Sequence, residues 1–323
     1  MNISEFRAEM NRLGQAKVPF LFMVDFEMEK PWVIKLSDVD PGRILFDVNG
    51  FTNVEKKLKS TGGMSIEKFP VPLEAYQKKF EKVFSHLEYG DSFLTNLTIK
   101  TVIKVNHSLT DIFFLSQAKY KLLLKEQFLV FSPEIFVQLK DGKIFSYPMK
   151  GTIDASTPNA KERLLNDKKE VSEHVTIVDL IRNDLSQIAS DVSVARFRYM
   201  DEIRTDSKTL LQVSSEIVGQ LEDNYFSYLG DILVRLLPAG SVSGAPKPKT
   251  LEIIKNVEGE KRGYYTGVFG VFDGKNLDSG VMIRFIEKQH EKYFYRSGGG
   301  ITTQSTVASE YQEAIDKVYV PVN

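Results

Sequence analysis

The sequence predicts an α+β fold built on antiparallel sheets. Predicted strands and helices alternate without the regular strand–helix–strand rhythm of a parallel sheet. Turn signals at Asp141-Gly142 and Asp273-Gly274 separate apolar runs, a pattern typical of β-hairpins. The 323 residues contain no repeat, low-complexity tract or linker, so we expect a single domain over residues 1–323.

The composition excludes several classes of protein. A net charge of -1 excludes a broadly basic surface for nucleic acid. The absence of cysteine excludes disulfides, thiolate metal sites and a Cys nucleophile for glutamine hydrolysis. The apolar run from Val18 to Val24 is too short to cross a membrane and is not arranged as a signal peptide. We therefore expect a cytoplasmic protein with no membrane contact.

The N-terminal elements are predicted to be scaffold. An amphipathic helix runs from Leu73 to Leu87, and Gly90 is placed to end it. Apolar runs bounded by Pro, Gly and Asp predict the strands. The other expected elements are a helix at Met1–Leu13, strands at Pro19–Phe26, Trp32–Leu36, Arg43–Val48, Ser92–Ile103 and Phe128–Ser132, and a helical stretch near Ser108–Lys119.

Lys150 follows a predicted hairpin formed by Phe136–Leu139 and Ile144–Tyr147. A lysine at a strand end, beside glycine and proline, can face a cleft. Loss of solvent there would lower its pKa and make a neutral amine available as a nucleophile. The alternative is an ordinary solvated lysine on a loop.

Glu170 and Glu173 lie three residues apart on a predicted helix, so both carboxylates project from one face. The apolar residues that predict this helix are Val171, Val175, Val178 and Ile181. Two neighbouring carboxylates repel each other and favour a cation, which could be Lys168, Lys169 or a metal ion.

Glu310 and Glu313 form a second such pair on a helix expected at Thr306–Val318. Glu313 could instead form a surface ion pair with Lys317. Two helices that each offer a carboxylate pair favour a shared cation. Oxygen ligands with room for water and substrate oxygens suit Mg²⁺.

Three further segments could bind an anionic ligand. Arg284 lies within a predicted strand and could hold a carboxylate in a bidentate pair or form a structural ion pair. Gly298–Gly300 follow a strand at Lys292–Ser297, and their amides could hold an anion. The small-residue loop Pro238–Lys247 would let a ligand approach the backbone. The remaining expected elements are strands at Val192–Ile203 and Leu211–Gln220, a helix at Tyr225–Leu237, a helix near Pro248–Val257 and a hairpin of Tyr264–Phe272 with Gly280–Glu287.

Motifs spread over most of the chain resemble the chorismate-utilising enzymes. They are Asn96-Leu-Thr98, Ser132-Pro-Glu134, Pro148-Met-Lys-Gly-Thr152, Ser172-Glu-His174, Ile177–Asp184, Gly240–Lys247, Arg262-Gly263, Ile283-Arg284, Ser297–Gly300 and Glu310–Glu313. Within that family, the lysine of Pro-x-Lys-Gly-Thr resembles the aminodeoxychorismate synthases, whereas anthranilate synthases usually have alanine there. Residues 1 to about 75 match poorly and look abbreviated, so a regulatory amino-acid pocket is not expected.

The resemblance implies large antiparallel sheets forming a sandwich flanked by helices, with the active site between them. It implies that Mg²⁺ binds the ring carboxylate of chorismate. The direct metal ligands would be Glu173 and Glu313, with Glu170 and Glu310 in support. The substrate-binding residues would be Arg284 and Tyr265 for the enolpyruvyl carboxylate, with Gly267, Gly298, Gly299, Gly300 and Ser241. Ammonia would come from a separate glutamine amidotransferase subunit.

The resulting hypothesis makes Lys150 a covalent catalyst. Its amine would add to ring carbon 2 while the 4-hydroxyl leaves, and ammonia would then enter at carbon 4 and expel the lysine, giving 4-amino-4-deoxychorismate. Gln212 stands where the family often has histidine, so the general acid is unassigned, with Lys247 and His174 as candidates. The alternatives are an anthranilate or isochorismate synthase, or a non-catalytic chorismate-binding protein.

Overall fold

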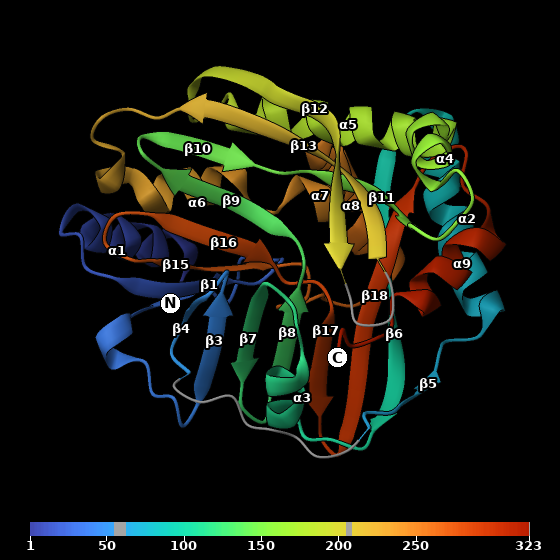
Figure 1. Cartoon of the computed structure of the whole chain (residues 1–323), viewed down its shortest axis with the longest axis horizontal. Coiled ribbons are helices and arrows are strands. Elements are labelled where there is room, and N and C mark those ends of the chain that lie inside the picture. Colours follow the sequence, from blue (N-terminus) through green and yellow to red (C-terminus); the bar gives the residue numbers. More distant parts are fainter. Residues whose placement is uncertain (55–62, 205–208, 323) are drawn as a thin grey trace.

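The computed structural model of the chain describes residues 1–54, 63–204 and 209–322. Within these residues two large antiparallel sheets, flanked by helices, make up the body of the molecule (Figure 1). The predicted α+β fold with antiparallel sheets is therefore confirmed.

The first sheet has nine strands among the described residues, in the order β11-β13-β10-β9-β16-β15-β1-β2, and β12 pairs with β13. Its strands are β1 (Phe20–Val24), β2 (Trp32–Lys35), β9 (Ile135–Lys140), β10 (Lys143–Ser146), β11 (Met149–Asp154), β12 (Ser190–Arg204), β13 (Thr209–Gln220), β15 (Val268–Phe272) and β16 (Leu277–Val281). The β9–β10 hairpin turns at Asp141-Gly142 as predicted.

The second sheet also has nine strands in the described part of the chain, in the order β14-β6-β18-β17-β8-β7-β3-β4, with β5 paired to β6. Its strands are β3 (Ile44–Val48), β4 (Phe51–Thr52), β5 (Ile66–Phe69), β6 (Leu94–Val105), β7 (Tyr120–Leu124), β8 (Phe128–Ser132), β14 (Gly244–Ala245), β17 (Phe285–Gln289) and β18 (Lys292–Ile301). Strand β7 was not expected from the sequence.

The helices cover the sheets, with α5 along the upper edge and α2 and α9 at the right in Figure 1. The helices are α1 (Ile3–Gln15), α2 (Leu73–Tyr89), α3 (Leu109–Leu115), α4 (Ala160–Asn166), α5 (Lys168–Leu185), α6 (Leu229–Leu236), α7 (Gly240–Ser243), α8 (Lys247–Glu258) and α9 (Val307–Asp316), with 3₁₀ turns at Leu36–Asp38 and Tyr225–Tyr228. Helix α2 ends as predicted, because Gly90 takes the left-handed conformation with φ 89°.

Apolar side chains from both sheets meet in the space between them. Leu21 and Phe269 from the first sheet pack in one cluster with Phe46, Leu122 and Phe285 from the second. This shared core fixes the position of one sheet relative to the other.

The segment around Arg284 differs from the prediction. Strand β16 ends at Val281 in the first sheet and β17 begins at Phe285 in the second, so the chain changes sheets between them. The expectation that Arg284 lies within a strand was therefore wrong. Arg284 has φ 54°, an uncommon conformation for a residue with a Cβ atom.

Two glycine-containing segments are more regular than expected. Gly298–Gly300 do not follow a strand but belong to β18, where they pair with Thr98, Leu97 and Asn96 of β6. The predicted loop Pro238–Lys247 contains the one-turn helix α7 and the short strand β14.

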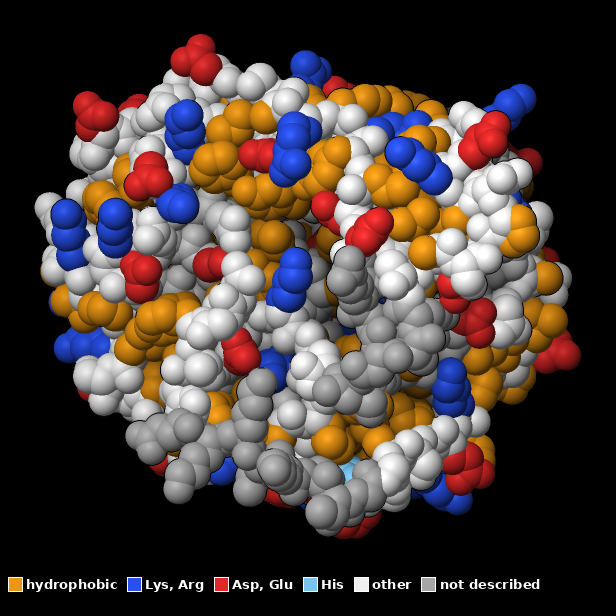
Figure 2. Space-filling view, in the orientation of Figure 1, with side chains coloured by type: hydrophobic (Ala, Val, Ile, Leu, Met, Phe, Trp, Pro, Cys, Tyr) orange, Lys and Arg blue, Asp and Glu red, His pale blue; other side chains and the backbone are white. Residues whose placement is uncertain are grey.

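The face of the molecule in Figure 2 carries acidic and basic side chains mixed together, with hydrophobic side chains between them. On that face no single sign of charge dominates a large area. In the described ranges, the helices are too short or too polar to span a membrane.

Candidate active site

Helix α5 turns Glu173 and His174 toward the interior. Its buried residues are Glu173, His174, Ile177, Val178 and Leu185. Val175, one of the apolar residues that predicted the helix, is 48% exposed. Because the buried face includes a carboxylate, Glu173 is only 6% exposed and needs a partner inside the protein.

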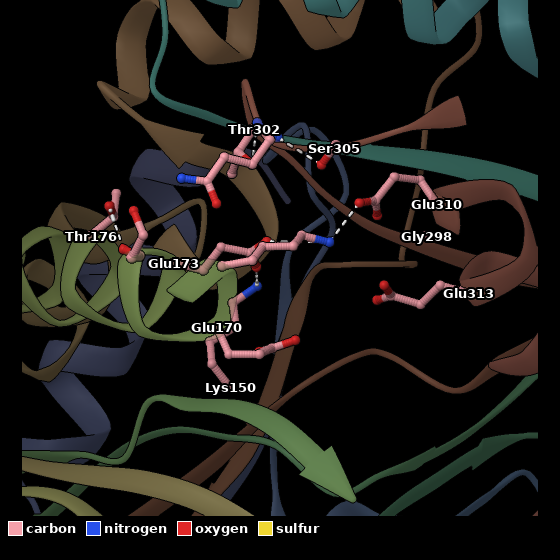
Figure 3. A network of polar contacts seen from close by, with 12 residues as sticks. Lys150, Glu170, Glu173, Thr176, Gly298, Thr302, Ser305, Glu310 and Glu313 are labelled. Carbon is pink, nitrogen blue, oxygen red and sulfur yellow. Dashed lines mark hydrogen bonds and ion pairs between the residues drawn. The ribbon is translucent and has the colours of Figure 1, made fainter. Parts of the chain in front are cut away.

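Lys150 on β11 provides one partner for Glu173. The Lys150 Nζ donates a hydrogen bond to the Glu173 Oε2 at 3.2 Å (Figure 3). The pairing of β11 with β13 shifts register between Lys150 and Thr152, and Gly151 has φ 77°. A Cβ atom on Gly151 would lie 3.2 Å from Glu170 Oε2, so this glycine leaves room for a second carboxylate beside Lys150.

Lys150 is protonated in this arrangement. Burial lowers its pKa, but the carboxylates of Glu173, Glu170 and Glu313 outweigh that effect and hold the pKa above its ordinary value. The expectation that desolvation alone would give a neutral amine was therefore wrong. Burial and the charge of Glu173 also raise the pKa of Glu170.

Helix α9 brings the second carboxylate pair to the same place. Figure 3 shows Glu310 and Glu313 projecting from α9 toward Glu173 on α5. Lys169 connects the two helices, because its Nζ lies 2.7 Å from Glu310 Oε1 and 3.7 Å from Glu173 Oε1. Glu313 instead accepts a hydrogen bond from Lys317 at 2.6 Å. The contact between the helices thus runs through Glu310, which the resemblance had placed in a supporting role.

Two buried carboxylate oxygens in this cluster lack a hydrogen-bond partner among the described residues, namely Glu173 Oε1 and Glu310 Oε2. Within the same residues, no group of three or more His, Cys, Asp or Glu side chains is arranged to hold a metal ion. Mg²⁺ commonly takes only one or two protein carboxylates and completes its shell with water and substrate oxygens. Two buried carboxylate oxygens without a hydrogen-bond donor, one from each helix, are ligands of the kind that Mg²⁺ takes.

The glycines of β18 leave space where these side chains meet. A Cβ atom on Gly299 would lie 3.3 Å from Glu313 Oε1 and 3.5 Å from Glu310 Oε2. A Cβ atom on Gly300 would lie 3.5 Å from the Lys150 Nζ. Because Gly299 and Gly300 have no side chains, the backbone of β18 lies close to the Glu310 and Glu313 carboxylates and to the Lys150 amine.

Arg284 lies where the chain crosses between the sheets, and the Tyr265 ring centroid lies 5.9 Å from that of Phe285, the next residue. The Arg284 Nε is buried and has no acceptor in the part of the chain that the structure describes, and the guanidinium carbon lies 5.1 Å from the Tyr319 ring centroid. This free N–H can donate a hydrogen bond to a substrate carboxylate. Tyr265 is 3% exposed. The Gly267 amide was expected to bind the substrate, but it already donates a hydrogen bond to the carbonyl oxygen of Tyr264 at 3.0 Å.

Glu134 also lies at the site, although no role for it was predicted from the sequence. It lies between β8 and β9, is partly buried and accepts a hydrogen bond from Ser241 of α7. Burial raises its pKa, against the opposing effects of Ser241 and of the positive charges of Lys150, Arg284 and Lys317. The motif Ser132-Pro-Glu134 was the available signal in the sequence. The motif alone could not show that the Glu134 carboxyl group lies near Lys150.

The two candidate general acids are committed elsewhere. Lys247 Nζ lies 2.6 Å from Asp184 Oδ2. Burial, with the charges of Arg198 and Lys150, lowers the pKa of His174 to about 4, so this imidazole is neutral near pH 7. His174 Nε2 lies 2.7 Å from the Ser215 Oγ, a contact that fits a structural role for this side chain.

Comparisons with known proteins identify the family of the chain. Residues 30–323 match the chorismate binding enzyme family. An uncharacterized PabA-like protein of Haemophilus influenzae is 48% identical over 320 residues, covering 99% of this chain and 97% of that protein. Aminodeoxychorismate synthase component 1 of Bacillus subtilis is 28% identical over 88% of this chain and 62% of its own length.

Solved structures show the same fold. The menaquinone-specific isochorismate synthase of Escherichia coli superimposes with a TM-score of 0.73 over 97% of this chain and 80% of that one, at 15% identity. Anthranilate synthase component I of Streptococcus pneumoniae gives 0.66 over 78% of this chain and 58% of that one, at 26% identity. The chain therefore belongs to the chorismate binding enzyme family.

Proposed function

We propose that this protein converts chorismate and ammonia into 4-amino-4-deoxychorismate, as an aminodeoxychorismate synthase component I. The observation that carries the proposal is the position of Lys150, whose amine reaches Glu173 and the glycine strand at the centre of the site. A primary amine at that point can act as a covalent catalyst. The similarity to the Bacillus subtilis aminodeoxychorismate synthase supports the same reaction.

The site offers a cation or an uncommitted donor for each charged group of chorismate. Glu173 and Glu310 would hold Mg²⁺, with Glu170 and Glu313 beside them, and the bound ion would bind the ring carboxylate and stabilise its negative charge. Arg284 would bind the enolpyruvyl carboxylate beside Tyr265. Orientation of the dianion at both ends would bring ring carbon 2 to Lys150.

Lys150 must lose a proton before it can attack. Glu134, whose raised pKa favours the protonated form, is suited to accept that proton and pass it to the departing hydroxyl group. The Lys150 nitrogen bonds to carbon 2, both ring double bonds shift by one position, the bond between carbon 4 and the hydroxyl oxygen breaks, and the hydroxyl leaves as water with the proton from Glu134. Ammonia then bonds to carbon 4, both double bonds shift back, and the carbon–nitrogen bond to Lys150 breaks. The net change replaces hydroxyl by amine and releases one water.

Ammonia must come from outside this chain or from solution. With no cysteine in the sequence, the chain has no thiol to hydrolyse glutamine by Cys–His chemistry. We therefore propose a separate glutamine amidotransferase subunit as the source. Ammonium salts should replace that subunit in the assay.

The test is a product assay of the purified chain with chorismate, Mg²⁺ and ammonium, analysed by chromatography and mass spectrometry. The proposal expects 4-amino-4-deoxychorismate, which yields 4-aminobenzoate only after an aminodeoxychorismate lyase is added. Fluorescent anthranilate or isochorismate as the main product would contradict the proposal. Chorismate binding without turnover would support the non-catalytic alternative.

A further inference from the structure

Lys169 lies where the two carboxylate helices meet. Its ammonium contacts Glu310 at 2.7 Å and Glu173 at 3.7 Å, so one positive charge is shared by acids from α5 and α9. Glu310 is 1% exposed and Glu173 6%, whereas the Lys169 side chain is 28% exposed. The lysine therefore reaches inward from the surface to neutralise two buried acids.

The same two acids each present a buried oxygen without a hydrogen-bond partner among the described residues. A buried carboxylate that loses its cation is strongly unfavourable. In the metal-free protein, Lys169 supplies that cation for Glu310 and, together with Lys150, for Glu173. Burial lowers the pKa of Lys169, but the hydrogen bond and charge of Glu310 outweigh that effect and hold the pKa above its ordinary value.

We propose that Lys169 is a built-in competitor of the divalent cation. This inference rests on the proposed function only in taking Glu173 and Glu310 as the acids that hold the metal ion. Two cations cannot share these oxygens without repelling each other, so binding of the metal ion requires the Lys169 ammonium to move away. The partial exposure of its flexible side chain gives it a route to solvent.

Lys169 would thus stabilise the metal-free site and limit its affinity for the metal. Replacing Lys169 by a neutral residue removes one positive charge within contact distance of both ligands. We expect the affinity for divalent cations to rise about tenfold or more, because a nearby unit charge changes the binding free energy by more than about 1.4 kcal/mol. The metal-free protein should at the same time melt at a lower temperature.

The experiment is a titration of the full chain with MgCl₂ or MnCl₂ by calorimetry, without chorismate, together with thermal melts in chelator and in metal. Lys169→Gln should bind the ion more tightly than the wild type and show a larger rise in melting temperature on adding metal. Lys168→Gln is the matched control, because Lys168 is adjacent on α5 but exposed. It should behave as the wild type in both measurements.

A second variant keeps the test decisive if Lys169→Gln does not fold. In Lys169→Arg, a guanidinium can hold both carboxylates and should weaken metal binding relative to the wild type. Unchanged affinity in the variants, or weaker binding in Lys169→Gln, would overturn the inference. If metal affinity falls in the order Lys169→Gln, wild type, Lys169→Arg, the inference about Lys169 holds. A product other than 4-amino-4-deoxychorismate would then overturn only the proposed function.

Discussion

Lys150 and Glu134 illustrate, at the scale of single residues, what the sequence could and could not predict. The Pro-Met-Lys-Gly-Thr motif predicted that Lys150 faces a functional site, and the structure places it against Glu173. Its protonation could not be predicted, because it depends on carboxylates brought in by α5 and α9. The role of Glu134 was missed for the same reason, since Lys150 and Arg284 become its neighbours only in the folded chain.

His174 leads to a prediction about pH. Burial, with Arg198 and Lys150, depresses its pKa in the folded protein to about 4, whereas an unfolded histidine titrates near 6.5. The unfolded chain therefore binds the proton more readily, and stability present above pH 6.5 is lost as the pH falls toward 4. His174 should lower the free energy of unfolding by about 2 kcal/mol between pH 7.5 and pH 5.

Chemical denaturation at several pH values measures this effect. The His174→Gln variant should show a weaker loss of stability on acidification than the wild type. His290→Asn, at an exposed turn, should keep the wild-type profile. Equal pH dependence in His174→Gln and the wild type would show that this histidine is not the titrating group.

At the scale of elements, hairpins with strong turn signals were predictable, whereas the change of sheet at Arg284 was not. Ile283 and Phe285 on either side of Arg284 mimic the alternation of a single strand. The strands before and after this segment lie in different sheets, because β16 pairs with β9 and β17 pairs with β8. Gly298–Gly300 were expected to follow a strand because glycine is a poor strand former, but pairing with β6 extends β18 through them.

Two neighbouring glycines of β18 should respond differently to alanine. A Cβ atom on Gly298 would lie 2.3 Å from the Leu97 carbonyl oxygen, so Gly298→Ala forces the strands apart and should destabilise the fold by about 1–3 kcal/mol. A Cβ atom on Gly299 would lie no closer than 3.3 Å to any atom, the nearest being Glu313 Oε1. Gly299→Ala should fold nearly as the wild type but lose activity by crowding the acids. Denaturation curves and the product assay together distinguish these outcomes, and equal loss of stability in both variants would contradict this account.

At the scale of the whole molecule, the two sheets are joined by polar contacts as well as by the apolar core. Tyr120 on β7 donates a hydrogen bond of 2.8 Å to Asp278 on β16, which also accepts one from Gln138. Burial raises the pKa of Asp278 despite these donors. The overall architecture was predictable from family motifs, but this contact was not, because β7 itself was missed.

Tyr120→Phe should destabilise the protein by about 1–3 kcal/mol, because it removes a donor from a largely buried carboxylate while keeping the ring that packs against Gly280. Denaturant titration near pH 7 measures the change. Tyr228→Phe is a suitable control, since Tyr228 is 45% exposed and should be nearly neutral. A Tyr120→Phe protein as stable as the wild type would mean that this contact does not help to hold the sheets together.

The most direct test of the proposed function is to look for the covalent link between Lys150 and the substrate. Chorismate would be mixed with the protein and Mg²⁺ in the absence of ammonium, the reaction quenched, and the digested chain analysed by mass spectrometry. The account predicts a substrate-derived mass on the peptide containing Lys150, and neither adduct nor 4-amino-4-deoxychorismate from Lys150→Ala. No adduct in the wild type, together with near-normal product formation by Lys150→Ala, would contradict it.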